Sequence, residues 1–508
     1  MNVGYLMTRS SYYFPDRIAF VIDGQPISYH ELNRRINKLA NALLSLGLKK
    51  GDRVGLLFHN SLAYLESHLA LYKAGLVWVR LNARLHPSEI KGMIEDSGAL
   101  VLIHGPEFGE TVEKASPDVR WVIQRGKGPG MDYEEFLQNG SDQEPEINVV
   151  LNDLSDLWYT SGTTGAPKGI MLTHRNILTC TQFLLCDVYD ITQEDRLLTV
   201  GALSHAGSVR ILPFVTRGAT NYLHSHFDSV KAFKEIESSK ITDLSTVPTI
   251  LIGLMDHPER PRFNLNSLKR ITYAGSPMPV ERIKEALNLF GPILDQSYGQ
   301  AESIITITHL SRREHILNGD PVWERRLASA GREYPGVQVK VVDENDCPLG
   351  PNEIGQVITR SDLVMRGYWN QPDKTEEALR GGWLHTGDIG YIDEDGYLYL
   401  VDRKHGKIIT GGLNVYPREV EEILAKHEVV SEVCVFGIPD PKWGEAITAA
   451  VTLRSGKDVS EKILIEFCKS KLASYKTPKK IYFLDSLPKN AYGKILQREL
   501  KKRFSGVD

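Results

Sequence analysis

Three hydroxyl side chains and two glycines stand together at Ser161–Gly165, and Lys168 follows them in the segment WYTSGTTGAPKGI. The segment shows neither the helical nor the strand-like repeat of apolar residues, so it offers no face for a core to bury. A glycine-rich turn can direct several backbone N–H groups into one concavity, where phosphate oxygens accept hydrogen bonds. The segment therefore indicates a phosphate-binding turn, although an exposed linker has a similar composition. Its spacing differs from that of the common P-loop NTPases.

Alternating strand and helix patterns surround this segment. The run RVGLLFHN, Arg53–Asn60, predicts a buried strand. The run SLAYLESHLALYKAG, Ser61–Gly75, predicts a helix that begins at a serine cap and ends at a glycine. The segments HPSEIKGMIEDSG and ALVLIHG repeat the order of helix and strand, and the rhythm continues to about Leu310. Strands that alternate with helices favour parallel sheets covered by helices on both faces.

The pattern changes after Gly331. Short strands separated by turns that contain Gly and Asp indicate a compact β-rich unit at about residues 331–401. Beyond it, Pro417 begins a helix whose apolar stripe contains Val420 and Leu424. The segments VSEVCVFGIPD, SEKILIEFCKSKL and KKIYFLDSLP then indicate a strand, a helix and a strand. Residues 402–508 are therefore expected to form a separate small α+β domain.

Composition narrows the class of protein. The 508 residues include 60 Lys plus Arg against 64 Asp plus Glu, for a formal net charge of -4, which argues against a protein that binds nucleic acid by bulk charge. The five cysteines form no C-x-x-C pair, so neither a zinc site nor a disulfide framework is indicated. No secretory apolar core and no bilayer-spanning stretch is found. These features predict a cytoplasmic protein.

Five segments together resemble the motifs of the adenylate-forming superfamily, which includes acyl-CoA synthetases, luciferases and peptide-synthetase adenylation domains. The segments are YTSGTTGAPKG, SYGQAES (Ser297–Ser303), HTGDIG (His385–Gly390), VDRKHGKIITGGLNVYPREVE (Val401–Glu421) and PKNAYGKILQREL (Pro488–Leu500). They occur in the family's order and at its spacing, and the resemblance extends from about residue 20 to residue 500. The chain is thus identified as a member of this superfamily.

The resemblance implies an α/β fold in two domains. A large N-terminal domain, residues 1–401, combines two α/β subdomains with a β-barrel-like segment at about 331–401, and a small mobile α+β domain, residues 402–508, follows. The implied activity is that of an acyl-CoA synthetase that depends on ATP and Mg2+. A carboxylate attacks the α-phosphorus of ATP, which gives an acyl-adenylate and pyrophosphate. A thiol, usually that of coenzyme A, then displaces AMP.

The same resemblance assigns roles to individual residues. Lys494 matches the catalytic lysine that bridges the carboxylate and the α-phosphate, where negative charge builds up. Glu302 matches the glutamate that binds Mg2+, and Asp388 matches the acceptor of hydrogen bonds from the ribose hydroxyls. The residues implied to bind ATP and AMP are Thr160, Ser161, Gly162, Thr163, Thr164, Gly165, Lys168, Gly275, Ser276, Tyr298, Gly299, Asp388 and Arg403.

The small domain is implied to present two different faces to one pocket. Asp402 matches the hinge about which the domain turns. The face for adenylation carries Lys494. The face for the thiol carries Gly411 and Gly412, where the absence of side chains leaves room for the pantetheine arm of CoA.

Two positions depart from the commonest pattern of the family. Ala301 stands where a threonine usually holds a phosphate oxygen, so either Ser303 or a water substitutes, or ATP binds more weakly. His405 stands where a lysine is common after the hinge, and an unperturbed histidine is mostly neutral at pH 7. The departure at Ala301 does not indicate an inactive enzyme, and the contact that His405 makes with the nucleotide or the interface stays open.

The stretch GALSHAGSVR, Gly201–Arg210, matches the one that lines the acyl pocket, and His205 aligns with a residue of the pocket wall. Relatives that activate amino acids place an aspartate here to hold the substrate ammonium, and no aspartate lies between Val200 and Arg210. Small and apolar residues suit an acyl or aromatic group. A medium- or long-chain fatty acid is the leading prediction, and an aryl or alicyclic acid is the alternative.

Three further hypotheses stay open. An acyl-carrier protein could accept the acyl group in place of CoA. A non-catalytic nucleotide-binding homologue is conceivable because of Ala301, although the presence of Lys494, Glu302 and Asp388 argues against it. A light-emitting relative would need an oxidation that no residue calls for. The oligomeric state is open, a homodimer included.

Overall fold

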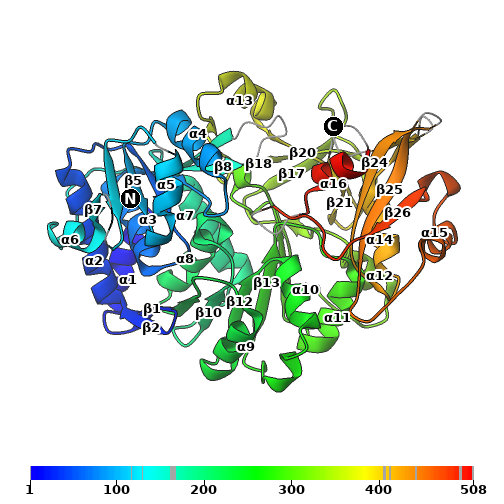
Figure 1. Cartoon of the computed structure of the whole chain (residues 1–508), viewed down its shortest axis with the longest axis horizontal. Helices are drawn as coiled ribbons and strands as arrows, with labels where there is room; N and C mark the ends of the chain where they lie inside the picture. Colours follow the sequence, from blue (N-terminus) through cyan, green and yellow to red (C-terminus); the bar gives the residue numbers. More distant parts are fainter. Residues whose placement is uncertain are drawn as a thin grey trace.

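The structure is a computed structural model of the chain. It describes residues 2–115, 117–126, 128, 130–160, 168–403, 408–410, 413–440, 443–490 and 495–505. In Figure 1 the chain runs from the N-terminal elements at the left (blue and cyan), through the centre (green), to the small C-terminal part at the right (orange and red). The predicted α/β class, with a large N-terminal part and a small C-terminal one, is confirmed.

The first sheet is mostly parallel and has eight strands in the order β19-β9-β8-β4-β3-β5-β6-β7. Its strands are β3 (Arg53–Leu57), β4 (Val77–Arg80), β5 (Val101–His104), β6 (Trp121–Gln124), β7 (Met131–Asp132), β8 (Leu154–Thr160), β9 (Lys168–Thr173) and β19 (Gly367–Tyr368). β8 and β9 form an antiparallel pair that ends with Thr160 opposite Lys168. The intervening residues 161–167 lie outside the described residues and begin at the carboxyl end of β8.

The second sheet has nine strands in the order β16-β15-β14-β13-β12-β10-β11-β1-β2. Its strands are β1 (Ile18–Ile22), β2 (Gln25–Ser28), β10 (Arg196–Thr199), β11 (Thr220–Leu223), β12 (Asp243–Thr246), β13 (Arg270–Ala274), β14 (Leu294–Tyr298), β15 (Thr308–Leu310) and β16 (Arg332–Glu333). Its central strands are parallel and its edge strands β2, β15 and β16 are antiparallel. The central strands are almost wholly buried, as parallel strands covered on both faces must be.

The predicted β-rich unit is a four-stranded antiparallel sheet. Its order is β17 (Gln338–Val342), β18 (Gly355–Arg360), β20 (Leu384–Ile392) and β21 (Leu398–Arg403). Among the described strands β17 and β21 are its two edges, so this sheet is open where the sequence led us to expect a barrel-like segment. The C-terminal sheet contains β22 (Ile408–Thr410), β23 (Leu413–Val415), β24 (Val430–Asp440), β25 (Gly444–Leu453) and β26 (Lys480–Phe483).

Helices cover these sheets. The described α-helices are α1 (Tyr5–Tyr13), α2 (Tyr29–Ser45), α3 (Leu62–Ala74), α4 (Pro87–Ser97), α5 (Gly109–Ala115), α6 (Tyr133–Gln138), α7 (His174–Phe183), α8 (Ser208–Thr216), α9 (Ser229–Ser238), α10 (Pro248–Asp256), α11 (Val280–Phe290), α12 (Pro321–Arg326), α13 (Pro372–Ala378), α14 (Pro417–Ala425), α15 (Glu461–Lys469) and α16 (Gln497–Ser505). Short helical turns are η1 (Pro106–Phe108), η2 (Leu184–Val188), η3 (Leu203–Gly207), η4 (Arg260–Arg262), η5 (Ala301–Ser303), η6 (Arg380–Gly382) and η7 (Ser474–Lys476).

Capping residues set the helix ends that the sequence indicated. The Ser61 hydroxyl accepts a hydrogen bond from the Tyr64 N–H, and Gly75 ends α3 with a φ of 66°, the left-handed conformation that glycine adopts without steric cost. Pro417 occupies the first turn of α14, where its missing N–H has no partner to lose. These local predictions are confirmed.

Two arginines of the C-terminal part contact the large N-terminal part. Arg454 forms an ion pair with Glu285 of α11 at 2.8 Å. Arg418 of α14 donates from Nη1 to the Leu400 carbonyl at 2.8 Å and from Nη2 to the Ala328 carbonyl at 3.4 Å. These contacts hold the small part in the arrangement seen at the right of Figure 1.

Three histidines are wholly buried in the N-terminal part. Burial, together with the positive charge of Arg80, lowers the pKa of His68 to about 3, and burial lowers the pKa of His174 and His315 to about 4. An unfolded chain protonates histidine below about pH 6.5. The folded state therefore keeps these rings neutral while the unfolded state binds protons.

We predict that the free energy of unfolding falls as the pH is lowered from about 6.5 toward 4, because the unfolded chain takes up the protons that the fold excludes. Each such histidine contributes a slope of about 1.4 kcal/mol per pH unit. Thermal unfolding at pH 7.5, 6.5 and 5.5 will show a shallower loss of Tm for His68→Gln than for the parent chain. His30→Gln, at an exposed position, is the control. Equal slopes in all three proteins would contradict the prediction.

Candidate active site

The candidate site lies where parallel strands of both sheets end. β13 leads into Gly275 and Ser276, β14 leads into Gly299 and Glu302, and β10 leads toward His205. Ligands in open α/β sheets bind beyond the carboxyl ends of the strands. The predicted residues on these segments are thus brought to one side of the second sheet.

A carboxylate held by two donors forms the first cluster. Asp388 of β20 is buried, and its Oδ2 accepts from the Tyr298 hydroxyl at 2.6 Å and from Gln300 Nε2 at 2.8 Å. Gln300 Nε2 also donates to the Thr386 carbonyl at 2.7 Å. The end of β14 and the strand β20 are fastened together by this cluster, which fixes the orientation of the Asp388 carboxylate.

A second carboxylate is held by a tyrosine. The Tyr368 hydroxyl donates to Glu302 Oε1 at 3.0 Å, and the Lys168 ammonium lies 5.0 Å from the centre of the Tyr368 ring. Burial, and the negative charge of Glu302, raise the pKa of the Tyr368 hydroxyl, so it remains a proton donor. One tyrosine from β19 therefore touches both the predicted metal ligand and the predicted phosphate-binding lysine.

The turn after Glu302 is strained. Ile304 has a φ of 44° and Ile305 a φ of 56°, values that branched side chains rarely adopt. A Cβ on Gly299 would lie 2.3 Å from the carbonyl carbon of Ile305. Gly299 is thus required by the close packing of the turn. The hydroxyl of Ser303 exchanges hydrogen bonds with the backbone of Gln300 and is buried, so it does not take the place of the hydroxyl missing at Ala301.

Gly275 differs from Gly299 in its surroundings. It has a φ of 93°, and a Cβ placed on it would meet only Val247, at 4.0 Å. The backbone of this segment is exposed on that side, which is the environment that a flat ring stacked on a glycine requires.

A buried arginine positions the predicted pocket wall. Arg80 of β4 pairs with Asp156 of β8 at 2.6 Å, and its guanidinium lies over the Trp78 and Trp158 rings at 4.1 and 4.4 Å. Its Nη1 donates to the His205 carbonyl at 3.3 Å. Arg80 thus connects the first sheet to the segment that runs between β10 and β11 of the second sheet.

His205 itself is half-buried. Its ring lies edge-on to Trp158, with centroids 5.7 Å apart, and its Nδ1 is 3.0 Å from the Ser204 hydroxyl. Burial, then the charges of Arg80 and Arg84, lower its pKa to about 3. A neutral imidazole beside an indole is suited to line an apolar pocket.

Several predicted residues are not covered by the description. Ser161, Gly162, Thr163, Thr164 and Gly165, together with His405, Gly411, Gly412 and Lys494, lie outside the described residues. For Thr160, Asp402 and Arg403 the backbone alone is described. Asp402 and Arg403 belong to β21 and pair with Ile389 and Asp388 of β20. The roles of all these residues stay predictions.

Four residues of the site were missed by sequence reasoning. Gln300 stands inside the quoted SYGQAES motif and Trp158 beside the hydroxyl-rich segment, so both were within reach. Arg80 and Tyr368 belong to unremarkable segments, and their importance appears only when the strands are assembled.

The donor atoms present at Glu302 fit a hard cation. Mg2+ prefers oxygen ligands and keeps waters and phosphate oxygens in its shell, so one protein carboxylate suffices in sites of this kind. Within the described part of the chain no group of three or more His, Cys, Asp or Glu side chains could hold a metal ion. The same part contains no helix that is both long and apolar enough for a membrane crossing.

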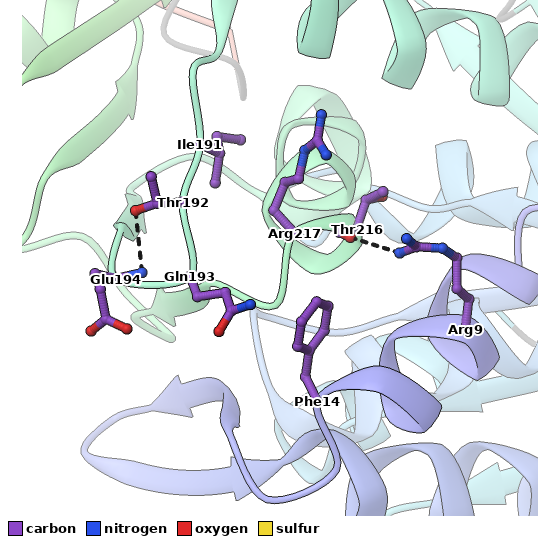
Figure 2. A pocket seen from close by; sticks show the side chains of 8 residues that line it. All are labelled: Arg9, Phe14, Ile191, Thr192, Gln193, Glu194, Thr216 and Arg217. Carbon is purple, nitrogen blue, oxygen red and sulfur yellow. Dashed lines mark hydrogen bonds between the residues drawn. The ribbon is translucent and has the colours of Figure 1, made fainter.

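A cavity of about 450 Å³ lies away from this site (Figure 2). It is lined by Arg9, Phe14, Ile191, Thr192, Gln193, Glu194, Thr216 and Arg217. Residues 191–194 precede β10, Thr216 and Arg217 lie at the end of α8, and Arg9 and Phe14 come from α1 and its C-terminal end. The candidate site lies instead beyond the carboxyl ends of the strands. Arg9 closes one side of the cavity by donating to the Thr216 carbonyl at 3.0 Å, as Figure 2 shows.

Comparisons with known proteins show the family to which the chain is similar. A family model described as AMP-binding enzyme matches residues 7–369, and one described as AMP-binding enzyme C-terminal domain matches residues 419–494. A protein of Amycolatopsis sp named feruloyl-CoA synthase is 36% identical over 493 residues, covering 96% of each chain. The medium/long-chain-fatty-acid–CoA ligase FadD8 of Mycobacterium tuberculosis is 39% identical over 497 residues, covering 93% of this chain and 85% of its own.

A solved structure shares the architecture. The anthranilate CoA ligase AuaEII, in complex with anthranoyl-AMP, superposes with a TM-score of 0.91 at 26% identity and covers 99% of this chain and 97% of its own. The likeness extends over both parts of the molecule.

Arg80→Met is predicted to destabilise the fold. The substitution leaves Asp156 buried without its cation, which costs about 3–5 kcal/mol. Thermal unfolding measures the effect. Arg34→Met removes an exposed arginine paired with Glu31 and should change Tm little, because exposed pairs contribute little. Similar Tm values for the two variants would show that Arg80 does not join the sheets.

Tyr368→Phe is predicted to weaken the binding of Mg2+ at Glu302, because it removes the hydroxyl that orients this carboxylate. The substitution keeps the aromatic ring beside Lys168. With one hydrogen bond to a charged group lost, the Mg2+ concentration for half-maximal activity should rise about tenfold, with little change at saturating Mg2+. Tyr391→Phe, which removes a hydroxyl from β20 at a ring stacked on Tyr399, is the matched control. An unchanged Mg2+ requirement in Tyr368→Phe would rule out this positioning role.

Proposed function

The chain belongs to the AMP-binding enzyme family and is an AMP-forming acid–CoA ligase, and we propose that it activates a medium- or long-chain fatty acid. In the first step the acid attacks the α-phosphorus of ATP and pyrophosphate leaves. In the second the thiol of CoA attacks the acyl carbon and AMP leaves. The observation that carries the two-step reaction is the pair of oriented carboxylates: Asp388 of β20, held by Tyr298 at the end of β14, and Glu302 just beyond β14.

The nucleotide is proposed to lie beyond β13 and β14. Asp388, held by Tyr298 and Gln300, would accept hydrogen bonds from the ribose hydroxyls. The open backbone at Gly275, with Ser276 beside it, would face the purine. Thr160–Gly165 and Lys168 would surround the phosphates, and Arg403 would add a further contact with the nucleotide. Mg2+, held by Glu302, would offset negative charge on the phosphates.

Besides Mg2+, Lys494 is proposed to supply positive charge during the first step. It would neutralise charge that develops between the carboxylate and the α-phosphate. The small domain would then turn at Asp402 and bring Gly411 and Gly412 to the pocket, so that the pantetheine arm can enter. Such a turn must break the ion pair between Arg454 and Glu285, which joins the two parts in the present arrangement.

The leading choice of acid rests on the stretch from Gly201 to Arg210. Its small and apolar side chains border the neutral ring of His205, and it contains no aspartate for a substrate ammonium. The similarity to a fatty-acid–CoA ligase of 39% identity supports the same choice. The scattered cysteines, free in the structure, support the proposed cytoplasmic location.

An aryl acid is the second candidate. A relative named feruloyl-CoA synthase and a structural neighbour that binds anthranoyl-AMP favour it. The indole of Trp158, edge-on to His205, would suit an aromatic ring placed beside them.

The test is pyrophosphate release with ATP and Mg2+ over a panel of acids, with and without CoA. The panel spans hexanoate to palmitate, benzoate, cinnamate, ferulate and cyclohexanecarboxylate. We expect release with the longer fatty acids, and a thioester when CoA is added. Lys494→Ala should slow release about 10²–10³-fold and leave the reaction of preformed acyl-adenylate with CoA intact.

Each outcome separates the candidates. Preference for cinnamate and ferulate would replace the fatty acid by the aryl acid. Release without a thioester would point to a carrier protein as the acceptor. Full activity of Lys494→Ala would overturn its catalytic role, and no release from any acid would favour a nucleotide-binding protein without catalysis.

A further inference from the structure

Among the residues that the structure describes, one buried arginine has no carboxylate as a partner. Arg80, Arg210, Arg270 and Arg282 are the arginines buried in the described part of the chain. Arg80, Arg270 and Arg282 each form an ion pair with at least one carboxylate, at 2.5–3.2 Å. Arg210, only 2% exposed, pairs with no carboxylate among the described residues.

The groups recorded around Arg210 are two tyrosines and a cysteine. Its Nη1 donates to the Tyr189 hydroxyl at 3.4 Å, a long bond, and its Nη2 is buried without a hydrogen-bond acceptor among the described residues. The charge also interacts with Tyr334 and Cys180. Burial raises the pKa of the Cys180 thiol to about 11, and burial raises that of the Tyr334 hydroxyl as well. Neither group supplies negative charge at neutral pH.

The position of Arg210 connects it to the site. It lies in the first turn of α8, five residues beyond His205 and at the end of the stretch proposed to hold the acid. Its neighbour Cys180 donates to the Ile304 carbonyl at 3.6 Å, and Ile304 begins the strained turn that follows Glu302. Arg210 thus lies at the end of the stretch proposed to hold the acid, and Cys180 connects it to the turn that follows Glu302.

A buried cation without a counter-charge is costly, and folds seldom retain one that serves only packing. An arginine offers a fork of donors that matches a carboxylate. The strained backbone nearby is a further feature found around ligand sites. These observations call for an acceptor that the described part of the chain does not provide.

We propose that Arg210 binds an oxygen acceptor at the end of the acyl group remote from the reacting carboxyl, and that a second carboxylate is its best ligand. The inference rests on the proposed function, because it places the acyl group beside the stretch that ends at Arg210. Within the proposed class it adds a preference for acids, aliphatic or aromatic, that also carry oxygen at the far end, such as ω-hydroxy and α,ω-dicarboxylic acids. Arg210 is in this sense a specificity-determining residue.

The experiment compares acids matched in length, in the full-length enzyme, by kcat/KM for pyrophosphate release. For each length from six to twelve carbons the set contains the monocarboxylate, its ω-hydroxy acid and its α,ω-dicarboxylate, and cinnamate is paired with 4-carboxycinnamate. We expect the dicarboxylate to exceed the monocarboxylate at least tenfold at the best length. In Arg210→Met this preference should fall below about twofold, while Arg210→Lys should retain part of it.

Thermal unfolding gives a readout that does not depend on the acid. Because Arg210→Met removes an unpaired buried charge in favour of an apolar side chain of similar length, its Tm should equal or exceed that of the parent chain. A clear fall in Tm, or an equal loss of activity with all acids, would show a structural role and overturn the inference. An unchanged dicarboxylate-to-monocarboxylate ratio in Arg210→Met would overturn it as well, and would leave the proposed function standing. No release from any acid would remove the proposed function and this inference together.

Discussion

The arrangement of the site depends on the contacts of one buried guanidinium, that of Arg80. It belongs to the first sheet, where Asp156 neutralises it and the rings of Trp78 and Trp158 enclose it. Its remaining donors reach the carbonyl of His205 and the hydroxyl of Ser208, at the start of the helix that covers the second sheet. A charge of this kind is favourable in the interior only when all its neighbours are in place, because a half-satisfied network is worse than an apolar core. The relative position of the two sheets, and hence the pocket wall, is therefore tied to one set of hydrogen bonds.

Hydrogen bonds also fix two side chains near the strand ends of the site. The carboxylates of Asp388 and Glu302 are each oriented by a tyrosine hydroxyl, one from β14 and one from β19. A preorganised acceptor needs no rearrangement when a ligand arrives, which is how fixed dipoles and charges contribute most to catalysis. The turn after Glu302 keeps two isoleucines at positive φ, and the close approach that Gly299 permits holds this turn in place. The oriented carboxylate of Glu302 and the strained turn are therefore adjacent, and the packing of the turn helps to fix the position of Glu302.

The sequence predicted those features that depend on neighbouring residues, and it did not predict those that depend on contacts between distant segments. The serine cap and the terminal glycine of α3 act within one helix, so Ser61 and Gly75 could be identified from spacing alone. The residues predicted for the site near β13, β14 and β20 came from the resemblance of whole motifs to those of a family, and their roles stay predictions. By contrast, Tyr368 meets Glu302 across 66 positions of the chain, and Arg80 meets His205 across 125. Such pairs depend on the order of strands in a sheet and on the packing of one sheet against another, neither of which periodicity determines. The open form of the β-rich sheet was missed for the same reason, since edge pairing is a tertiary property.

The contrast between Arg80 and Arg210 shows how structural and functional charges differ in one interior. Both are buried, and both belong to elements that border the proposed pocket. Arg80 finds a carboxylate, two aromatic rings and two oxygen acceptors within the chain, so its cost is offset when the protein folds. The described surroundings of Arg210 are two tyrosines and a thiol, with no carboxylate among them. A charge without a counter-charge in the described part of the chain keeps its electrostatic energy available for a later partner, and an anionic ligand that enters the pocket would gain that energy. The distribution of counter-charges, more than the burial of the arginines, thus separates the residue that builds the pocket from the one that selects its occupant.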